Sequence, residues 1–157
     1  MEEEKVEAIL SLSNPLVRGY LFYASILIVK MISMSFITVL FRTTRKVSAN
    51  PEDQRFYHKE KSDEEYVWSD PLVERIRRAH LNDLENIVPF LILGIFYLLC
   101  SPAAATAMNV FRAFTCARVL HSVVYLNEIP QPARALCFLS GAGINLYMAY
   151  VIISTTM

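Results

Sequence analysis

Four long apolar stretches divide the chain, and each is close to the length that a helix needs to cross a lipid bilayer. They run over about 16–41, 72–100, 103–126 and 133–154. A hydrocarbon core of roughly 30 Å takes about 20 helical residues, so each stretch predicts a transmembrane helix. We therefore expect an all-α fold: a single integral membrane four-helix transmembrane bundle over 1–157, with a polar connection over about 42–71.

The second stretch is unusual because a charged segment, ERIRRAHLNDLEN, leads directly into it. Its uncharged part, Ile87–Cys100, has only 14 residues, so the charged turns must continue the same helix if it is to span the core. Ser69 or Asp70 can cap that helix, and Pro71 fits its first turn. The charges then serve either as interfacial anchors or as a binding surface for a polar ligand.

Composition limits the class of protein further. Hydrophobic residues make up 54% of the 157 residues, which is too apolar for an average soluble domain. The formal net charge is zero, so we expect no nucleic-acid partner. Cys100, Cys116 and Cys137 lack metal-ligand spacing, and we expect them to be reduced and the protein to need no metal.

The distribution of charge predicts the orientation in the membrane. The connection over 42–71 is rich in basic residues, including Arg42, Arg45 and Lys46. The N-terminal segment MEEEKVEAIL is acidic where a signal peptide would be basic, so we expect the first apolar stretch to be retained as an anchor. By the positive-inside rule the connection is cytoplasmic and both termini are lumenal.

Polar residues fall on one face of the second and third predicted helices. On the second helix the spacing i, i+4, i+7, with two flanking residues, gives Arg78, Asn82, Glu85, Arg77 and His80. On the third helix the spacing i, i+3, i+4, i+7 gives Arg118, His121, Ser122 and Tyr125. Ionisable groups at membrane depth are costly and normally point into a bundle or a cavity, so these two faces predict a site.

Structural roles compete with that interpretation. Arginines at a helix entrance, such as Arg75, often only anchor the helix at the interface. Glu85 could neutralise Arg78 or Arg118, and His121 could simply hydrogen-bond between helices. Lys30 is expected to reach the interface or to pair with another charge, and we assign it no chemistry.

Several arginines, a carboxylate, an amide and a tyrosine suit an anionic ligand with two carboxylates and one amine. Arginine binds carboxylates as a fork, and glutamate suits an ammonium group. Glutathione has these groups and a thiol. A guanidinium near that thiol would favour the thiolate and create a nucleophile, and Arg134, just after Pro-Gln-Pro, is well placed for this role. The physical argument gives the type of ligand and not its identity.

Four segments carry a more specific resemblance: TRKVSANPED (44–53), VERIRRAHLNDLENIVPFL (73–91), the Ala-Arg, His and Tyr-Leu of 117–126, and PQPARAL (130–136). They resemble the membrane-associated proteins in eicosanoid and glutathione metabolism, the MAPEG family, and within it most closely the type-one microsomal glutathione transferases. The resemblance covers nearly the whole chain. It implies homotrimers in the endoplasmic reticulum and outer mitochondrial membranes, with glutathione bound between subunits near the cytosolic face.

The resemblance also assigns residues. Positions where the family contacts glutathione are occupied here by Arg42, Arg77, Arg78, His80, Asn82, Glu85, His121 and Tyr125. Arg134 matches the arginine that stabilises the thiolate. Gln54 stands where mammalian type-one enzymes carry a cysteine whose modification activates them, so that activation is not expected here.

The prostaglandin E synthase branch of the family provides an alternative. Asp53, Arg118 and Ser122 match positions discussed for its isomerisation of the endoperoxide, with glutathione as cofactor. Leu81 and Ala135 differ from the arginine and serine of that branch, which favours the transferase.

We therefore expect an enzyme that conjugates glutathione to hydrophobic electrophiles entering from the bilayer and that also reduces lipid hydroperoxides. Prostaglandin endoperoxide isomerisation is the second hypothesis. A non-catalytic membrane scaffold, whose charged faces only pair helices, is the third.

Overall fold

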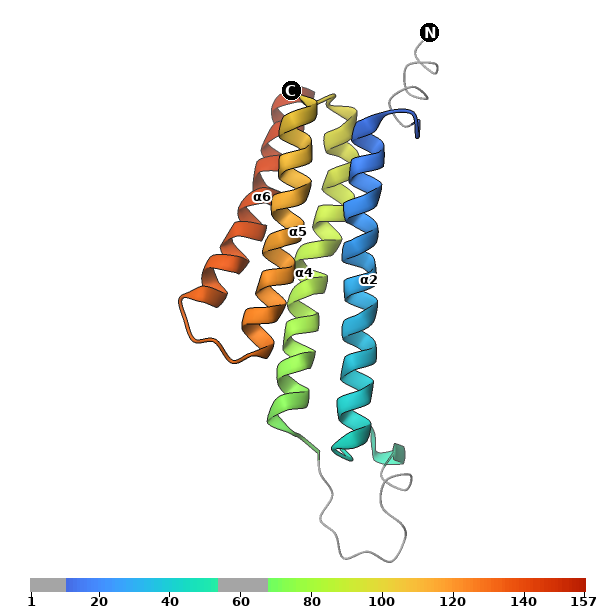
Figure 1. Cartoon of the computed structure of the whole chain (residues 1–157), viewed down its shortest axis with the longest axis vertical. Coiled ribbons are helices and arrows are strands. Elements are labelled where there is room, and N and C mark those ends of the chain that lie inside the picture. Colours follow the sequence, from blue (N-terminus) through green and yellow to red (C-terminus); the bar gives the residue numbers. More distant parts are fainter. Residues whose placement is uncertain (1–10, 54–67) are drawn as a thin grey trace, which may run out of the picture.

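The computed structural model describes residues 11–53 and 68–157, which are helical apart from short connections. Four long helices form the bundle: α2 (Pro15–Thr44), α4 (Pro71–Leu99), α5 (Ala104–Leu126) and α6 (Ala133–Thr156). A short 3-10 helix, η1 (Pro51–Asp53), follows α2. Each long helix packs against at least two others (Figure 1). The prediction of an all-α four-helix bundle is confirmed.

The surface of the bundle suits a membrane. By length and composition, α2, α4 and α6 are each able to cross one. Large apolar side chains point outward on these helices, for example Phe36 and Leu146, each 71% exposed. The helix α5 is not one of these three, and its inner face carries Thr115 and Arg118, among other polar residues, which are buried in the bundle. The chain is therefore an integral membrane protein with a group of polar residues buried inside the bundle.

Local sequence signals set the ends of the helices. Asp70 caps α4: its carboxylate accepts hydrogen bonds from the backbone N–H groups of Leu72 and Val73, at 2.9 and 3.1 Å. The charged segment and the apolar segment form one continuous helix, as predicted. The helix α2 continues to Thr44, so Arg42 lies in its last turn instead of in the connection.

The Asn-Pro pair after α2 forms a local turn, which is typical of this dipeptide. The turn is η1, and the Asp53 carboxylate accepts a hydrogen bond from the backbone N–H of Asn50 at 3.2 Å. The prediction made on Gln54 lies outside the described residues, and so does most of the basic connection over 42–71 from which the orientation was predicted.

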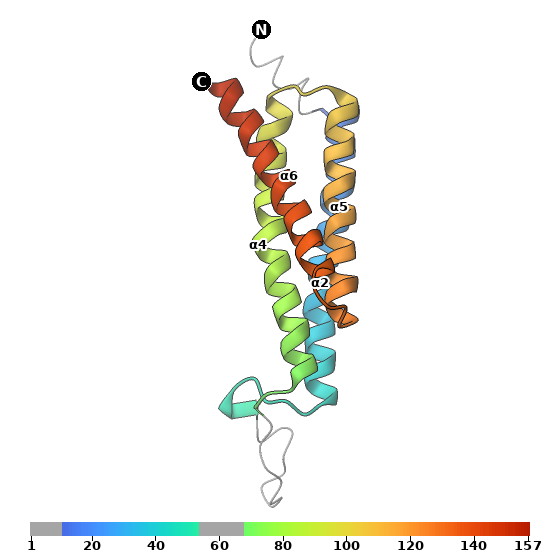
Figure 2. The ribbon, with the colours of Figure 1, turned by 90° about the vertical axis from the view of Figure 1, so that its left-hand side faces the viewer.

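The bundle is not uniform along its length. At one end, α2 and α4 extend beyond the turn that joins α5 to α6 (Figure 1). The helix α6 is tilted across the bundle, and it contacts both α5 and α4 (Figure 2). A cavity lies beside α4 near the start of α6 and is described below.

The core between α2, α4 and α5 is aromatic toward the end where α2 begins. Phe90 and Phe114 stack with their ring centroids 4.0 Å apart, and Phe111 meets Tyr20 edge-on at 5.5 Å. Tyr97 adds a second edge contact to Phe111. These five residues, all buried, are called the aromatic core below. Dense aromatic packing fixes the helices there and positions the polar groups farther along.

Candidate functional site

Next to the aromatic core, three helices contribute charged groups to one buried set. Lys30 of α2 donates hydrogen bonds to the carboxylate of Asp83 on α4 and to the Ser122 hydroxyl on α5, the latter at 2.7 Å. Arg118 of α5 donates to the other Asp83 oxygen at 2.7 Å. Asp83 and Arg118 are completely buried. Lys30, Asp83, Arg118 and Ser122 are called the interior charge cluster below.

Asp83 is a residue that the sequence argument missed. It lies in the segment HLNDLEN, where attention fell on Asn82 and Glu85. The available signal was its spacing from Ile76, Ala79 and Phe90, which places it on the buried apolar face of α4. A carboxylate on that face requires a cationic partner at membrane depth. Lys30 accordingly pairs within the bundle, which was one of the two roles predicted for it.

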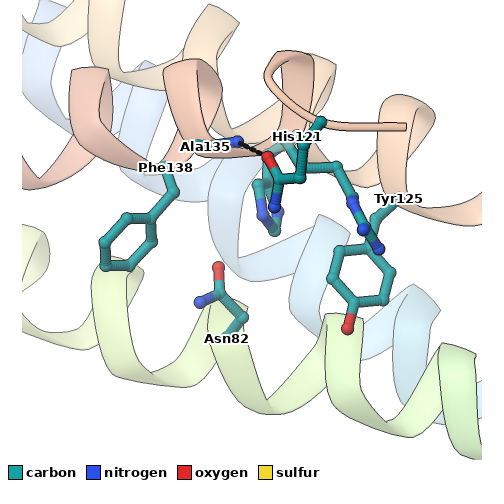
Figure 3. A pocket seen from close by; sticks show the side chains of 7 residues that line it. Asn82, His121, Tyr125, Ala135 and Phe138 are labelled. Atoms are coloured by element: carbon teal, nitrogen blue, oxygen red, sulfur yellow. Dashed lines mark hydrogen bonds between the residues drawn. The ribbon is translucent and has the colours of Figure 1, made fainter. Parts of the chain in front are cut away.

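A cavity of about 410 Å³ lies beside the interior charge cluster, between α4, the end of α5 and the start of α6. It is lined by Asn82, His121, Tyr125, Gln131, Arg134, Ala135 and Phe138, and is called the α4–α6 cavity (Figure 3). The cavity therefore brings together Arg134, Asn82, His121 and Tyr125, four of the residues predicted to bind or activate glutathione.

Within the α4–α6 cavity, Arg134 is positioned by an aromatic ring. Its guanidinium carbon lies 5.3 Å from the centroid of the Tyr125 ring, a cation–π contact. The start of α6 is held by Gln131, whose side-chain oxygen accepts a hydrogen bond from the backbone N–H of Ala135 at 3.1 Å (Figure 3). Arg134 thus presents its planar donor group at a wall that also carries an amide, an imidazole and a phenol.

The cavity wall and the interior charge cluster are connected through Arg118. The Nη2 atom of Arg118, which contacts Asp83, also donates to the Asn82 side-chain oxygen at 2.8 Å and lies 3.4 Å from Nδ1 of His121. Arg118 itself does not line the α4–α6 cavity. Arg118 nevertheless contacts Asn82 and His121, which do line it, so only these side chains separate its charge from a ligand in the cavity.

Glu85 lines a second cavity, of about 350 Å³, next to the first. Phe138 belongs to both cavities, and Asn86 and Asn145 are among the other residues of the second one. The Asn145 amide donates to the backbone carbonyl of Asn86 at 3.0 Å. The Glu85 carboxylate is therefore close to, but outside, the set around Arg134.

The remaining predicted residues lie elsewhere in the chain. Arg77, Arg78 and His80 line a third cavity, of about 150 Å³, with Leu81 and Leu84. Arg77 also pairs with Glu74 at 2.9 Å. Among the isomerase-type residues, Arg118 and Ser122 belong to the interior charge cluster and Asp53 to the η1 turn. Arg42, in the last turn of α2, does not line these three cavities.

The α4–α6 cavity is chemically suited to an anion. Arg134 supplies a permanent cation, and the Asn82 amide, His121 ring and Tyr125 hydroxyl supply further hydrogen-bond donors. In the described residues, no three His, Cys, Asp or Glu side chains are grouped so that they could hold a metal ion. Guanidinium groups bind carboxylates well and also stabilise a thiolate.

Comparison with known proteins gives a consistent result. Residues 20–154 match the model of the MAPEG family. The chain is 48% identical to human microsomal glutathione S-transferase 1 over 135 residues, which cover 86% of this chain and 87% of that protein. It is 45% identical to the pig protein of the same name over 146 residues, 93% and 94% of the two chains. Human prostaglandin E synthase is 37% identical over 129 residues, 82% of each chain.

Proposed function

The chain belongs to the MAPEG family, and on that premise we propose that it is a membrane-bound glutathione transferase that adds the glutathione thiolate to hydrophobic electrophiles. The observation that carries the proposal is the position of Arg134 on a cavity wall with Asn82, His121 and Tyr125. The relatives with 45% and 48% identity are named glutathione S-transferases.

The proposed reaction begins with the binding of glutathione as a thiol. Arg134 stabilises the thiolate that forms when the thiol loses its proton to water, and Tyr125 holds the guanidinium in place. The thiolate then attacks the electrophilic carbon, a C–S bond forms, and the leaving group departs with its electron pair. We expect Glu85, which lines the neighbouring cavity, to bind the glutathione amine.

The second substrate is proposed to arrive from the bilayer. The outer faces of the helices are apolar, so a hydrophobic electrophile or a lipid hydroperoxide can reach the cavity laterally. With a hydroperoxide, the thiolate attacks the terminal peroxide oxygen, so the O–O bond breaks, glutathione sulfenic acid forms and the alkoxide leaves as an alcohol after taking up a proton. A second glutathione then reduces the sulfenic acid, which gives glutathione disulfide and water. Peroxidase activity is therefore part of the proposal.

A homotrimer would complete the site. One subunit presents Arg77, Arg78 and His80 on a different cavity from Arg134, so these predicted contacts do not converge within a single chain. We propose that the α4–α6 cavity of one subunit meets the basic start of α4, and Arg42, of a neighbouring subunit. The proposed location is the endoplasmic reticulum membrane, and also the outer mitochondrial membrane, with the cavity on the cytosolic side and the termini in the lumen.

The test replaces Arg134. An Arg134→Ala protein should lose about 100-fold in kcat for conjugation of an electrophilic aryl halide, a loss typical for removal of one group that stabilises a reacting anion. The ultraviolet absorbance of bound thiolate should disappear as well. Arg112→Ala is the matched control, because Arg112 contacts Tyr23 and does not line the cavity. Full activity and unchanged thiolate absorbance in Arg134→Ala would contradict the mechanism.

Prostaglandin endoperoxide isomerisation is the second candidate, favoured by the 37% identity to human prostaglandin E synthase. The rates of endoperoxide isomerisation and of aryl halide conjugation, measured on one preparation, separate the two. The transferase is favoured because the relatives named transferases are more similar to this chain.

The scaffold hypothesis is tested by titrating the detergent-solubilised protein with glutathione. Saturable binding contradicts a purely structural role. An exchange of Glu85 for Gln should then weaken glutathione binding through the amine without changing thermal stability, because Glu85 is exposed in the subunit.

A further inference from the structure

Arg118 connects the interior charge cluster to the cavity wall without lining the cavity itself. Its Nη2 atom faces the carboxylate of Asp83, the amide oxygen of Asn82 and the Nδ1 atom of His121, at 2.7, 2.8 and 3.4 Å. Two of these three residues line the α4–α6 cavity. One buried guanidinium nitrogen is therefore in contact with two separate parts of the wall.

The first contact fixes the orientation of an amide. A guanidinium nitrogen can only donate, so the Asn82 atom that faces Arg118 must be the oxygen. The Asn82 oxygen is directed toward His121, and its nitrogen points away from it (Figure 3). Both N–H groups of Asn82 are then available to a ligand. Without Arg118, the amide could turn and offer an acceptor instead.

The second contact fixes a tautomer. The His121 Nδ1 atom lies 3.4 Å from the same guanidinium nitrogen, whose two hydrogens also serve Asp83 and Asn82, so this longer contact shares one of them. Because that nitrogen cannot accept, Nδ1 is the acceptor and carries no proton. The single ring proton is then on Nε2. His121 in this state is a hydrogen-bond donor through Nε2, as Asn82 is through its amide nitrogen.

Arg118 can orient Asn82 and His121 only if its own guanidinium group is fixed, and the ion pair with Asp83 fixes it. Asp83 accepts from Arg118 through one oxygen and from Lys30 through the other. Lys30 also donates to Ser122, so the carboxylate is anchored from α2 and α5 together. Two cations and one carboxylate leave one positive charge buried beside the cavity, and this charge further favours an anionic ligand.

We propose that Lys30, Asp83 and Arg118 form a positioning unit, in which Arg118 sets Asn82 and His121 as hydrogen-bond donors for the carboxylate or carbonyl oxygens of glutathione. The inference rests on the proposed function, because it concerns glutathione in the α4–α6 cavity. Arg118 is a positioning residue: it acts on the ligand through its two neighbours.

A double-mutant cycle on the full chain in detergent tests the unit, with glutathione Kd as the readout. Arg118→Lys keeps the positive charge, but the shorter side chain places its ammonium group short of the position of Nη2, which reaches all three partners, and it should weaken binding about tenfold. In an Asn82→Ala background, the same change should cost about threefold or less, because only the His121 contact is left. Arg112→Lys on the same helix is the control and should leave Kd unchanged.

The outcomes separate the two proposals. Saturable wild-type binding together with an undiminished tenfold loss in the Asn82→Ala background would show that Arg118 does not act through Asn82, and the positioning unit would be rejected. Absence of glutathione binding by the wild-type protein would instead reject the proposed function, and the positioning unit with it. A smaller loss in the Asn82→Ala background supports both.

A spectroscopic measurement decides the point if Arg118→Lys does not fold. The ring nitrogen shifts of ¹⁵N-histidine in the wild-type protein report the tautomer directly, and His121→Gln assigns the signal. We expect His121 to be protonated on Nε2 alone. A proton on Nδ1 would contradict the proposal, since Nδ1 could not then accept from Arg118.

Discussion

The two parts of the bundle interior are stabilised in opposite ways. The aromatic core, around Phe90 and Phe111, consists of ring contacts that leave few polar atoms to satisfy. The interior charge cluster contains charged groups that pair with one another, and two of them, Asp83 and Arg118, have no exposed surface. An apolar substitution of similar volume changes the free energy of unfolding only modestly. A buried charge that loses its partner is strongly destabilising.

This difference indicates which part serves the chemistry. An apolar side chain of similar volume in place of a buried ion pair is often neutral or stabilising, so the interior charge cluster is not needed for stability alone. It lies against the wall of the α4–α6 cavity, and the aromatic core does not. We infer that the aromatic core holds the helices rigidly, whereas the interior charge cluster orients the side chains of Asn82 and His121 on the cavity wall.

The largest expected effect comes from removing the shared carboxylate. Asp83→Ala leaves Lys30 and Arg118 as neighbouring cations without a counter-charge, and we expect a loss of about 3–5 kcal/mol in the free energy of unfolding. Denaturant titration in detergent micelles measures it.

A variant that removes all three charges is the control. Lys30→Met/Asp83→Leu/Arg118→Met should recover most of that stability while glutathione binding remains weak. Equal instability of the single and triple variants would show that the charges themselves hold the helices together, and the contrast between the two regions would be lost.

The second prediction addresses the aromatic core. Phe111 is completely buried and contacts Tyr20, Phe90 and Tyr97. Phe111→Ala should lower the free energy of unfolding by about 3 kcal/mol, because the space left behind is only partly filled. The KM for glutathione should stay within about twofold in the folded fraction, since Phe111 does not line the cavity. A large rise in KM would mean that the two regions are not separate.

Much of this organisation could be predicted from the sequence, since it depends on periodicity along a single helix. The spacing of Arg118, His121 and Ser122 placed them on one face of α5, and all three are buried in the structure. The cap at Asp70 and the turn at Asn50 also follow from local residue preferences. These features need no information about neighbouring helices.

The rest depends on contacts between helices. The segment HLNDLEN carries four polar or charged side chains in five positions, Asn82 to Asn86, apart from Leu84. Helical spacing places Asp83 on the buried face of α4, but it does not show that Lys30 and Arg118 are the residues that meet it there, because both partners are on other helices. Nor does it show that Arg77 and Arg134 line different cavities, since that depends on how α6 crosses α4.

The third prediction concerns two glycines that differ in their surroundings. A Cβ atom at Gly94 would overlap the ring of Tyr20, so Gly94→Ala should destabilise the protein by about 2 kcal/mol. At Gly143 the space around a Cβ atom is open to 4 Å, and Gly143→Ala should stabilise α6 by about 0.5 kcal/mol. Thermal unfolding of the two variants in parallel checks both. Similar values would mean that the region around Tyr20 is loosely packed.

The smallest expected effect distinguishes a surface ion pair from a buried one. Arg75, at the start of α4, pairs with Glu128 after α5 at 3.2 Å, and the Glu128 side chain is 67% exposed. Because water screens such a pair, Glu128→Gln should change the free energy of unfolding by about 0.5 kcal/mol or less, about a tenth of the effect of Asp83→Ala. Denaturant titration at low and high salt provides the measurement, and the small difference should vanish at high salt. If Glu128→Gln matched Asp83→Ala, burial would not be what separates these ion pairs, and the assignment of Arg75 to anchoring alone would have to be abandoned.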